Sequence, residues 1–95
     1  MLEALKKLQW TILGHDLLCA RVQIDILARS PTRVLTIVEV KSQTARRLGH
    51  LTRGQFLRLQ RASEFLAQCE PVQIQLALCE SNRVLLIPVD GLTHF

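Results

Sequence analysis

The chain has 95 residues, of which 48% are hydrophobic and 21% are charged, and its formal net charge is +4. This length fits one domain, residues 1–95, and the composition excludes a disordered chain. No apolar run approaches the ~20 residues that a bilayer-spanning helix needs, and the N-terminal segment lacks the apolar stretch of a secretory signal. We therefore expect a cytoplasmic protein without a membrane partner.

Hydrophobic patterning predicts a helix and three strands in the first half of the chain. Residues 2–9 are predicted to form a short amphipathic helix, and residues 10–19 a strand with a bend or bulge at Gly14. Apolar and polar residues alternate in residues 21–29, which is typical of a strand. A turn is expected next, at Ser30–Arg33, and a third strand at residues 34–41.

The second half is predicted to contain a loop, a helix and two strands. Residues 42–51 are polar and basic, which favours a loop, and Thr52 is a candidate N-cap for a helix that extends to about Cys69. Residues 72–80 and 83–89 are predicted to form a hairpin. The core-facing stripe of the helix contains Phe56, Leu59, Ala62 or Ser63, Leu66 and Cys69, with Phe65 also expected in the core. The order α-β-β-β-α-β-β predicts a mixed sheet in an α/β (α+β) domain.

The chain contains three cysteines, Cys19, Cys69 and Cys79, which are far apart. Their spacing matches neither a metal site nor a redox pair. Each lies in an apolar segment, so each is expected to be a small buried hydrophobic residue. Unpaired cysteines are typical of a reducing compartment, in agreement with a cytoplasmic location.

The strands predicted at residues 21–29 and 34–41 form a hairpin around the turn at Ser30–Arg33. Three charged residues interrupt its apolar strands: Asp25, Glu39 and Lys41. If the turn centres on Thr32, Asp25 is opposite Glu39 and Gln23 is opposite Lys41, all on one face. The further pairs in this register are Leu27 with Ile37 and Arg29 with Leu35. The register therefore predicts that the charges form one constellation.

The opposite face of this hairpin is predicted to be almost wholly apolar. It would contain Val22, Ile24, Ile26 and Ala28 on one strand, and Val34, Thr36, Val38 and Val40 on the other. A slip of one residue would bring Glu39 onto this face, so the apolar pattern independently supports the register.

Two directly opposed carboxylates are destabilising on a sheet unless a cation compensates them. Mg²⁺ (or Mn²⁺) suits Asp25 and Glu39, because hard divalent cations prefer carboxylate and carbonyl oxygens. The Lys41 ammonium beside such a cation can orient a water and neutralise charge that develops on a phosphate. The alternative is three solvated charges on an exposed strand face.

Basic residues are concentrated between positions 41 and 61. This interval contains half of all Lys and Arg and neither Asp nor Glu. The basic residues are Lys41, Arg46, Arg47, Arg53, Arg58 and Arg61. Such a block indicates a polyanionic partner, and the alternative is a solvated loop and helix face.

Asp25 followed by Glu39-Val40-Lys41 resembles the signature of the PD-(D/E)XK nuclease superfamily, an Asp and then Glu-X-Lys on the returning strand. The surrounding segments resemble those of the YraN-like family of predicted endonucleases, a Holliday-junction-resolvase-like branch. The similar segments are VQIDILA, TIVEVK and the basic helix RGQFLRLQRASEFL, which begins at Arg53. The likeness extends from Trp10 over nearly all of the chain.

This resemblance implies a restriction-endonuclease-like core and a role for each matching residue. Asp25, Glu39 and the Val40 carbonyl would be the metal ligands, and Lys41 would be the catalytic lysine. Gln55 matches a glutamine on the family's helix and is an accessory candidate. Gln23, the other accessory candidate, stands where the family pattern has a glutamate.

The function that follows is a Mg²⁺-dependent endonuclease that hydrolyses phosphodiester bonds in DNA, with branched or repair-related DNA as the implied substrate. The arginines of the basic block, Arg46, Arg47, Arg53, Arg58 and Arg61, would hold the DNA backbone. Cutting a branched or duplex substrate would favour a two-fold homodimer. Two alternatives remain open: a catalytically inactive nucleic-acid-binding module with the nuclease fold, and a protein-interaction subunit.

Overall fold

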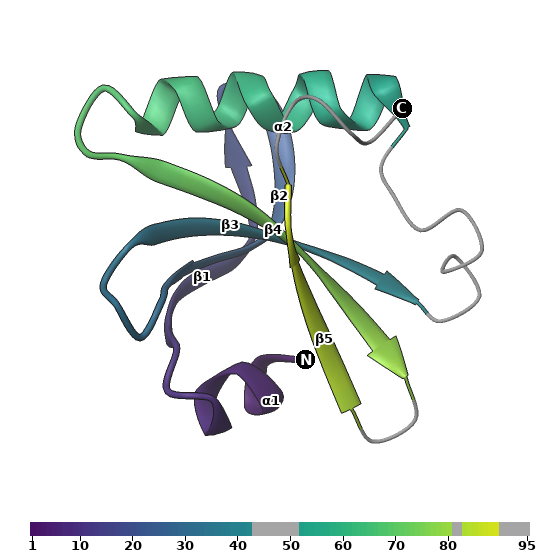
Figure 1. Cartoon of the computed structure of the whole chain (residues 1–95). Helices are drawn as coiled ribbons and strands as arrows, with labels where there is room; N and C mark the ends of the chain where they lie inside the picture. The colour runs from purple at the N-terminus through teal and green to yellow at the C-terminus, as the bar shows by residue number, and fades with distance from the viewer. Residues whose placement is uncertain (43–51, 81–82, 90–95) are drawn as a thin grey trace.

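The computed structural model of the chain describes residues 1–42, 52–80 and 83–89 (Figure 1). Its elements are α1 (Leu2–Lys7), β1 (Thr11–Cys19), β2 (Val22–Arg29), β3 (Leu35–Ser42), α2 (Arg53–Leu66), β4 (Val72–Glu80) and β5 (Arg83–Pro88). The predicted order is confirmed, with element boundaries that differ by no more than three residues. Apart from Ser42, which ends β3, the predicted loop lies outside the described residues.

The strands form one mixed sheet in the order β1-β2-β3-β4-β5. β3 and β4 are parallel and α2 connects them, whereas the other neighbouring strands are antiparallel. Figure 1 shows α2 across one side of the sheet and α1 on the other side. This α+β arrangement is consistent with the expected restriction-endonuclease-like core. In the described part of the chain, no helix is long and apolar enough to cross a membrane.

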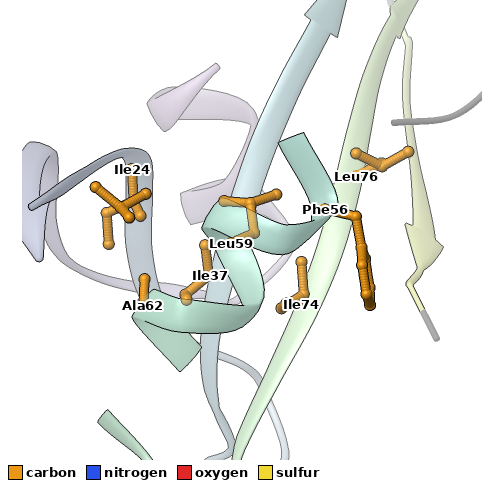
Figure 2. Close-up of a cluster of buried hydrophobic side chains, with 8 residues drawn as sticks. Ile24, Ile37, Phe56, Leu59, Ala62, Ile74 and Leu76 are labelled. Atoms are coloured by element: carbon orange, nitrogen blue, oxygen red, sulfur yellow. The ribbon is translucent and has the colours of Figure 1, made fainter. Parts of the chain in front are cut away.

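Two groups of buried hydrophobic side chains hold the helices against the sheet. The α2 cluster contains Val22, Ile24, Ile37, Phe56, Leu59, Ala62, Ile74 and Leu76 (Figure 2). The α1 cluster contains Leu5, Trp10, Ile26, Ala28, Val38 and Ala77. The central strands are therefore covered on both sides, which explains why their sequences are so continuously apolar.

The prediction of a single apolar hairpin face is wrong for β2. Ile24 packs in the α2 cluster, whereas Ile26 packs in the α1 cluster. In a regular strand, residues two apart lie on the same face, so β2 changes sides between these residues. The change coincides with Asp25, which has no partner in the register with β1 or in the register with β3. Pairing is therefore interrupted on both sides of Asp25.

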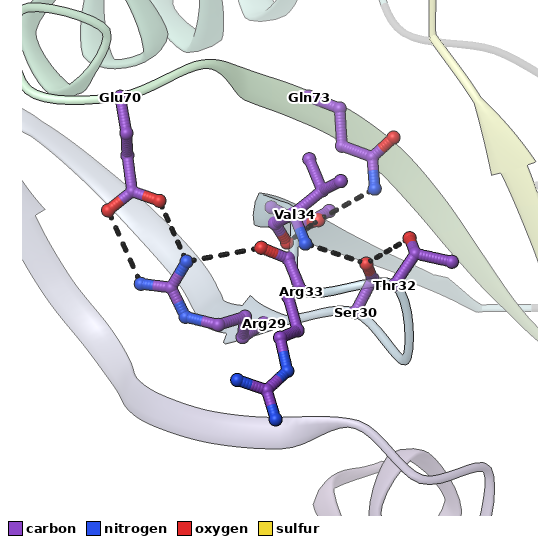
Figure 3. Close-up of polar contacts among 8 residues, drawn as sticks. Arg29, Ser30, Thr32, Arg33, Val34, Glu70 and Gln73 are labelled. Carbon is purple, nitrogen blue, oxygen red and sulfur yellow. Dashed lines mark hydrogen bonds and ion pairs between the residues drawn. The ribbon is translucent and has the colours of Figure 1, made fainter.

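The predicted turn between β2 and β3 is confirmed at Ser30–Arg33 (Figure 3). The Ser30 carbonyl accepts a hydrogen bond from the Arg33 N–H at 2.8 Å, and the Ser30 hydroxyl accepts one from the Val34 N–H at 3.0 Å. Arg33 adopts a φ of 69°, which closes the turn in the left-handed region. The same turn fixes the predicted register, in which Leu27 pairs with Ile37.

Side chains next to this turn tie it to β4 and to the segment before it. Arg29 donates to both carboxylate oxygens of Glu70, at 2.7 and 3.3 Å (Figure 3). Thr36 is fully buried; its hydroxyl donates to the Val34 carbonyl at 2.9 Å and accepts from the Gln73 amide at 2.8 Å. We call the turn together with Arg29 and Thr36 the closed end of the hairpin.

Helix α2 begins where predicted and ends earlier than predicted. Thr52 is its N-cap, and Gln55 completes a capping box: the Thr52 hydroxyl accepts from the Gln55 N–H and the Gln55 amide oxygen accepts from the Thr52 N–H. After Leu66 the α-helix gives way to a tighter turn, in which the Cys69 N–H donates to the carbonyl of Leu66, three residues before it. Cys69 therefore lies beyond the helix and is exposed, so its predicted burial is wrong.

Two other side-chain predictions are corrected by the structure. Phe65 is 53% exposed, because it projects about 120° around the helix from Leu59, beyond the buried stripe. Its ring lines a shallow apolar pocket that also includes Leu18. Cys19 and Cys79, also predicted to be buried, are only half-buried.

The predicted bulge in β1 is confirmed, because the pairing with β2 shifts between Ile12 and Gly14.

Candidate active site

The β2–β3 ladder ends before β3 does. Its last pair is Ile26 with Val38, whereas β3 continues beside β4 as far as Ser42. The edge of β3 that faces β2 is therefore open from Glu39 onward. Because the ladder has already ended, the predicted backbone pairings of Asp25 with Glu39 and of Gln23 with Lys41 do not form. We call Asp25, Glu39, Val40 and Lys41 the open end of the hairpin.

Asp25 spans the opening with its side chain instead of its backbone. Its Oδ2 accepts a hydrogen bond from the Val40 N–H at 2.9 Å. In an extended strand the N–H and C=O of one residue point toward the same neighbour, so the Val40 carbonyl also faces the β2 side. Carboxylate and carbonyl oxygens thus converge at this point of the sheet.

Glu39 is the most perturbed ionisable group among those described. Its Oε1 is buried and has no hydrogen-bond partner in the described part of the chain. The pKa of Glu39 is raised to about 8, and burial is the largest cause. The hydrogen bond with Asp25 and the negative charge of Asp25 also raise the pKa, whereas the positive charges of Lys41 and Arg58 lower it. At neutral pH the Glu39 carboxyl is therefore mainly protonated unless a cation compensates it.

These donors fit a divalent cation. The Glu39 oxygen that lacks a partner among the described residues, the Asp25 carboxylate and the Val40 carbonyl form the hard-oxygen set that Mg²⁺ accepts. Within residues 1–42, 52–80 and 83–89, no three His, Cys, Asp or Glu residues cluster closely enough to form a larger metal site. Mg²⁺ commonly binds one or two carboxylates and completes its shell with water and substrate phosphate. The open end matches that pattern, and the cation remains a prediction.

The two accessory glutamines lie outside the open end or are engaged elsewhere. Gln23 is exposed and pairs with Leu18 of β1. Gln55 is half-buried, and its amide oxygen is used in the capping box with Thr52. The spacing T-x-x-Q in residues 52–55 is a known capping signature, which could have indicated this second role from the sequence. Their accessory roles remain predictions.

The three predicted DNA-binding arginines that the structure describes do not all lie on one side of α2. Arg58 is close enough to Glu39 to affect its pKa, and Arg61, also exposed, is one turn further along α2. Arg53 is exposed about 140° around the helix from Arg58. Arg46 and Arg47 lie outside the described residues. Of the three described arginines, Arg58 is thus the one that the fold brings to the carboxylates.

The α+β fold, with its five-stranded mixed sheet and with Asp25 beside a Glu-Val-Lys strand, is consistent with a restriction-endonuclease-like core. The chain belongs to the uncharacterised protein family UPF0102, the YraN-like family of predicted endonucleases, whose sequence profile matches residues 1–88. The family resemblance predicted from the sequence is thereby confirmed. A comparison with curated proteins gives no significant match.

Proposed function

We propose that the protein is a metal-dependent endonuclease that hydrolyses phosphodiester bonds in DNA, acting on branched or repair-related substrates. The observation that carries this proposal is the open end, where Asp25 and Lys41 lie near a buried Glu39 oxygen that has no hydrogen-bond partner among the described residues. A purely structural strand pair would not retain an unsatisfied buried carboxyl oxygen, because such a group costs about 1–3 kcal/mol.

Each residue of the open end has a distinct role in this proposal. The Val40 N–H holds the Asp25 carboxylate in place, so that Asp25 and Glu39 present oxygens to one point. A divalent cation bound there would supply polarisation of the scissile phosphate and activation of a water molecule. The Lys41 ammonium, two residues from Glu39 on the same strand, would stabilise negative charge on the phosphate and orient the attacking water.

DNA is the proposed substrate because the basic block adjoins the open end. Lys41 begins an interval that contains half of all Lys and Arg and no acidic residue. Contacts from these cations to backbone phosphates would position the duplex without reading its sequence. A two-fold homodimer would allow both strands of a branched substrate to be cut.

One observation favours a second candidate, a nucleic-acid-binding module that does no chemistry. The described residues contribute two carboxylates to the open end, and Gln23 stands where the family pattern has an acid. Such a module would bind DNA and would show no cleavage that depends on Mg²⁺ or Mn²⁺.

A cleavage assay on branched and linear DNA with Mg²⁺ or Mn²⁺ tests the proposal. We expect the wild type to cut and Asp25→Asn to be inactive, although the asparagine oxygen can still accept from the Val40 N–H. Glu64→Gln is the matched control, since Glu64 is an exposed acid on α2 and should be dispensable. Equal cleavage by pure Asp25→Asn protein would exclude this site, and a DNA-binding but inactive wild type would favour the binding module.

A further inference from the structure

We propose that Arg58 is the residue that binds the phosphate to be cleaved, by contact with its non-bridging oxygens. This assignment rests on the proposed nuclease function and deepens it. It singles out one of the five arginines in the basic block and gives it a place at the reacting group. The remaining arginines keep the role of holding the DNA backbone.

The orientation of α2 on the sheet determines where Arg58 projects. Figure 2 shows Phe56 on the side of α2 nearest Leu76 of β4, and Ala62 on the side nearest Ile24 of β2. At about 100° per residue, Arg58 projects about 40° from Ala62 and about 160° from Phe56. Arg58 therefore leaves the helix on the flank that faces β2, the strand that carries Asp25.

The Arg58 side chain extends toward the N-terminus of α2. Its Nη1 lies 3.7 Å from the position that a Cβ of residue 54 would occupy. The side chain therefore runs back along the helix by one turn, as helical side chains generally do, and its guanidinium covers Gly54. This path places the positive charge over the N-terminal turn of α2.

The positive charge of Arg58 acts on Glu39 at the open end. Arg58 is one of two cations whose charge opposes the burial-driven rise in the pKa of Glu39, the other being Lys41. Geometry agrees with this: Ile37 packs in the α2 cluster, so Glu39, two residues further along β3, also points toward α2. The Arg58 guanidinium, over the N-terminal turn of α2, therefore lies on the same side of the sheet as the Glu39 carboxyl. It stands on α2, opposite Lys41 on β3, so a phosphate at the open end would lie between two cations from different elements.

No described carboxylate forms an ion pair with this guanidinium. No ion pair within 4.0 Å involves Arg58 in the described part of the chain, whereas Arg29 binds Glu70 through two nitrogens. Arg58 therefore has donors available for an external anion. The planar fork of an arginine matches two oxygens of one phosphate, which a lysine cannot do.

This placement has a consequence that a solvated surface arginine would not have. Arg58 repels a cation at Asp25 and Glu39 and attracts a phosphate at the same point. Its removal should therefore strengthen metal binding in the absence of DNA and weaken cleavage in its presence. Removal of Arg61, an exposed arginine one turn further from the N-terminus of α2, should change neither Mn²⁺ affinity nor kcat and should act on DNA binding alone.

The experiment compares the full-length wild type with Arg58→Ala, Arg58→Lys and, as control, Arg61→Ala. Mn²⁺ affinity is measured by calorimetry without DNA, and kcat and KM are measured on branched DNA. Arg58→Ala should bind Mn²⁺ roughly two- to tenfold more tightly, because a nearby positive charge is gone. Its kcat should fall about 10²-fold, the loss typical of one donor to a developing charge.

The two other variants separate a bidentate contact from a general positive charge. Arg58→Lys should recover part of kcat and the wild-type Mn²⁺ affinity. Arg61→Ala should raise KM and reduce the salt dependence of binding with kcat unchanged. If the wild type cleaves and Arg58→Ala equals it in both Mn²⁺ affinity and kcat, the Arg58 assignment is wrong and the nuclease function stands. A wild type that neither binds Mn²⁺ nor cleaves overturns both.

Discussion

The two ends of the β2–β3 hairpin use polar residues in opposite ways. At the closed end, the buried Thr36 hydroxyl has two protein partners, because it donates to the Val34 carbonyl and accepts from the Gln73 amide. At the open end, Glu39 has a buried oxygen without a described partner, and its pKa is raised to about 8. The closed end therefore stabilises the fold, whereas the open end leaves binding capacity for a ligand.

This contrast predicts opposite consequences of substitution. A change at the closed end should lower the free energy of unfolding and leave cleavage per folded molecule intact. A change at the open end should abolish cleavage without loss of stability.

The largest expected effect is that of Lys41→Ala on cleavage. Removing a cation that stabilises charge on the phosphate should lower kcat by about 10²–10³-fold. Mn²⁺ affinity should rise, as expected for Arg58→Ala, because Lys41 is not a ligand and its positive charge repels a cation at Glu39. Single-turnover cleavage with calorimetry measures both quantities. If the variant retains its rate, the catalytic role of Lys41 is refuted.

At the closed end, Thr36→Val should lower the free energy of unfolding by about 1–3 kcal/mol, because the Gln73 amide loses its buried acceptor. Urea denaturation measures this loss, and cleavage should be unchanged under folding conditions. The double variant Thr36→Val with Gln73→Leu is the control. It removes both partners and should recover much of the stability. A stable Thr36→Val would show that this buried bond is dispensable.

The stability of the metal-free protein should fall as pH rises. Folded Glu39, with a pKa near 8, still holds a proton at pH values where the unfolded chain, with a pKa near the ordinary 4.5, has released it. Proton binding by the folded state thus makes the free energy of unfolding decrease between about pH 5 and pH 8, and the decrease levels off above pH 8. Thermal melts in the presence of a chelator measure the slope.

Glu39→Gln should remove most of this slope and be more stable than the wild type at pH 9, because the buried charge is gone. Glu64→Gln should keep the wild-type slope. A wild type with a flat profile across this range would show that Glu39 is ionised in the folded protein without a cation.

The smallest expected effect is that of Gly54→Ala, which should raise the free energy of unfolding by up to about 1 kcal/mol. A Cβ at this position would meet the Arg58 guanidinium at 3.7 Å, an ordinary contact, so Mn²⁺ affinity should be unchanged. Thermal melts and calorimetry measure the two quantities. A large change in Mn²⁺ affinity would instead show that the bare surface of Gly54 is needed to place Arg58.

The hairpin register could be predicted because two independent signals agree. The turn at Ser30–Arg33 and the alternation of apolar residues both place Leu27 opposite Ile37. The interruption at Asp25 could not be predicted, because β-branched Ile24 and Ile26 on either side favour a regular strand. It results from tertiary packing, in which these two residues join different helices.

Other features of the fold had weak local signals. The turn between β1 and β2 has positive φ values at Ala20 and Arg21, 51° and 65°, yet it contains no Gly or Asn to reveal it. Cys69 was expected in the core because helical periodicity does not show where α2 ends. Phe65 was expected there because it is a large apolar side chain, although it projects about 120° around the helix from Leu59.

Of the candidate site, the sequence predicts the acidic pair and Lys41 from their spacing along two strands. It could not distinguish Arg58 from the neighbouring arginines, since composition and periodicity treat Arg53, Arg58 and Arg61 alike. Only the packing of α2 on the sheet brings one of them to the carboxylates.

Calorimetric titration of the full-length protein with Mn²⁺ at pH 7, in buffers of different ionisation enthalpy, tests the central claim most directly. The wild type should show a binding event that releases protons, because Glu39 must lose its proton to bind a cation. Asp25→Asn and Glu39→Gln should each abolish it, while Glu64→Gln retains it. A flat wild-type titration, or undiminished binding by Asp25→Asn, would contradict the assignment of the open end as a metal-dependent nuclease site.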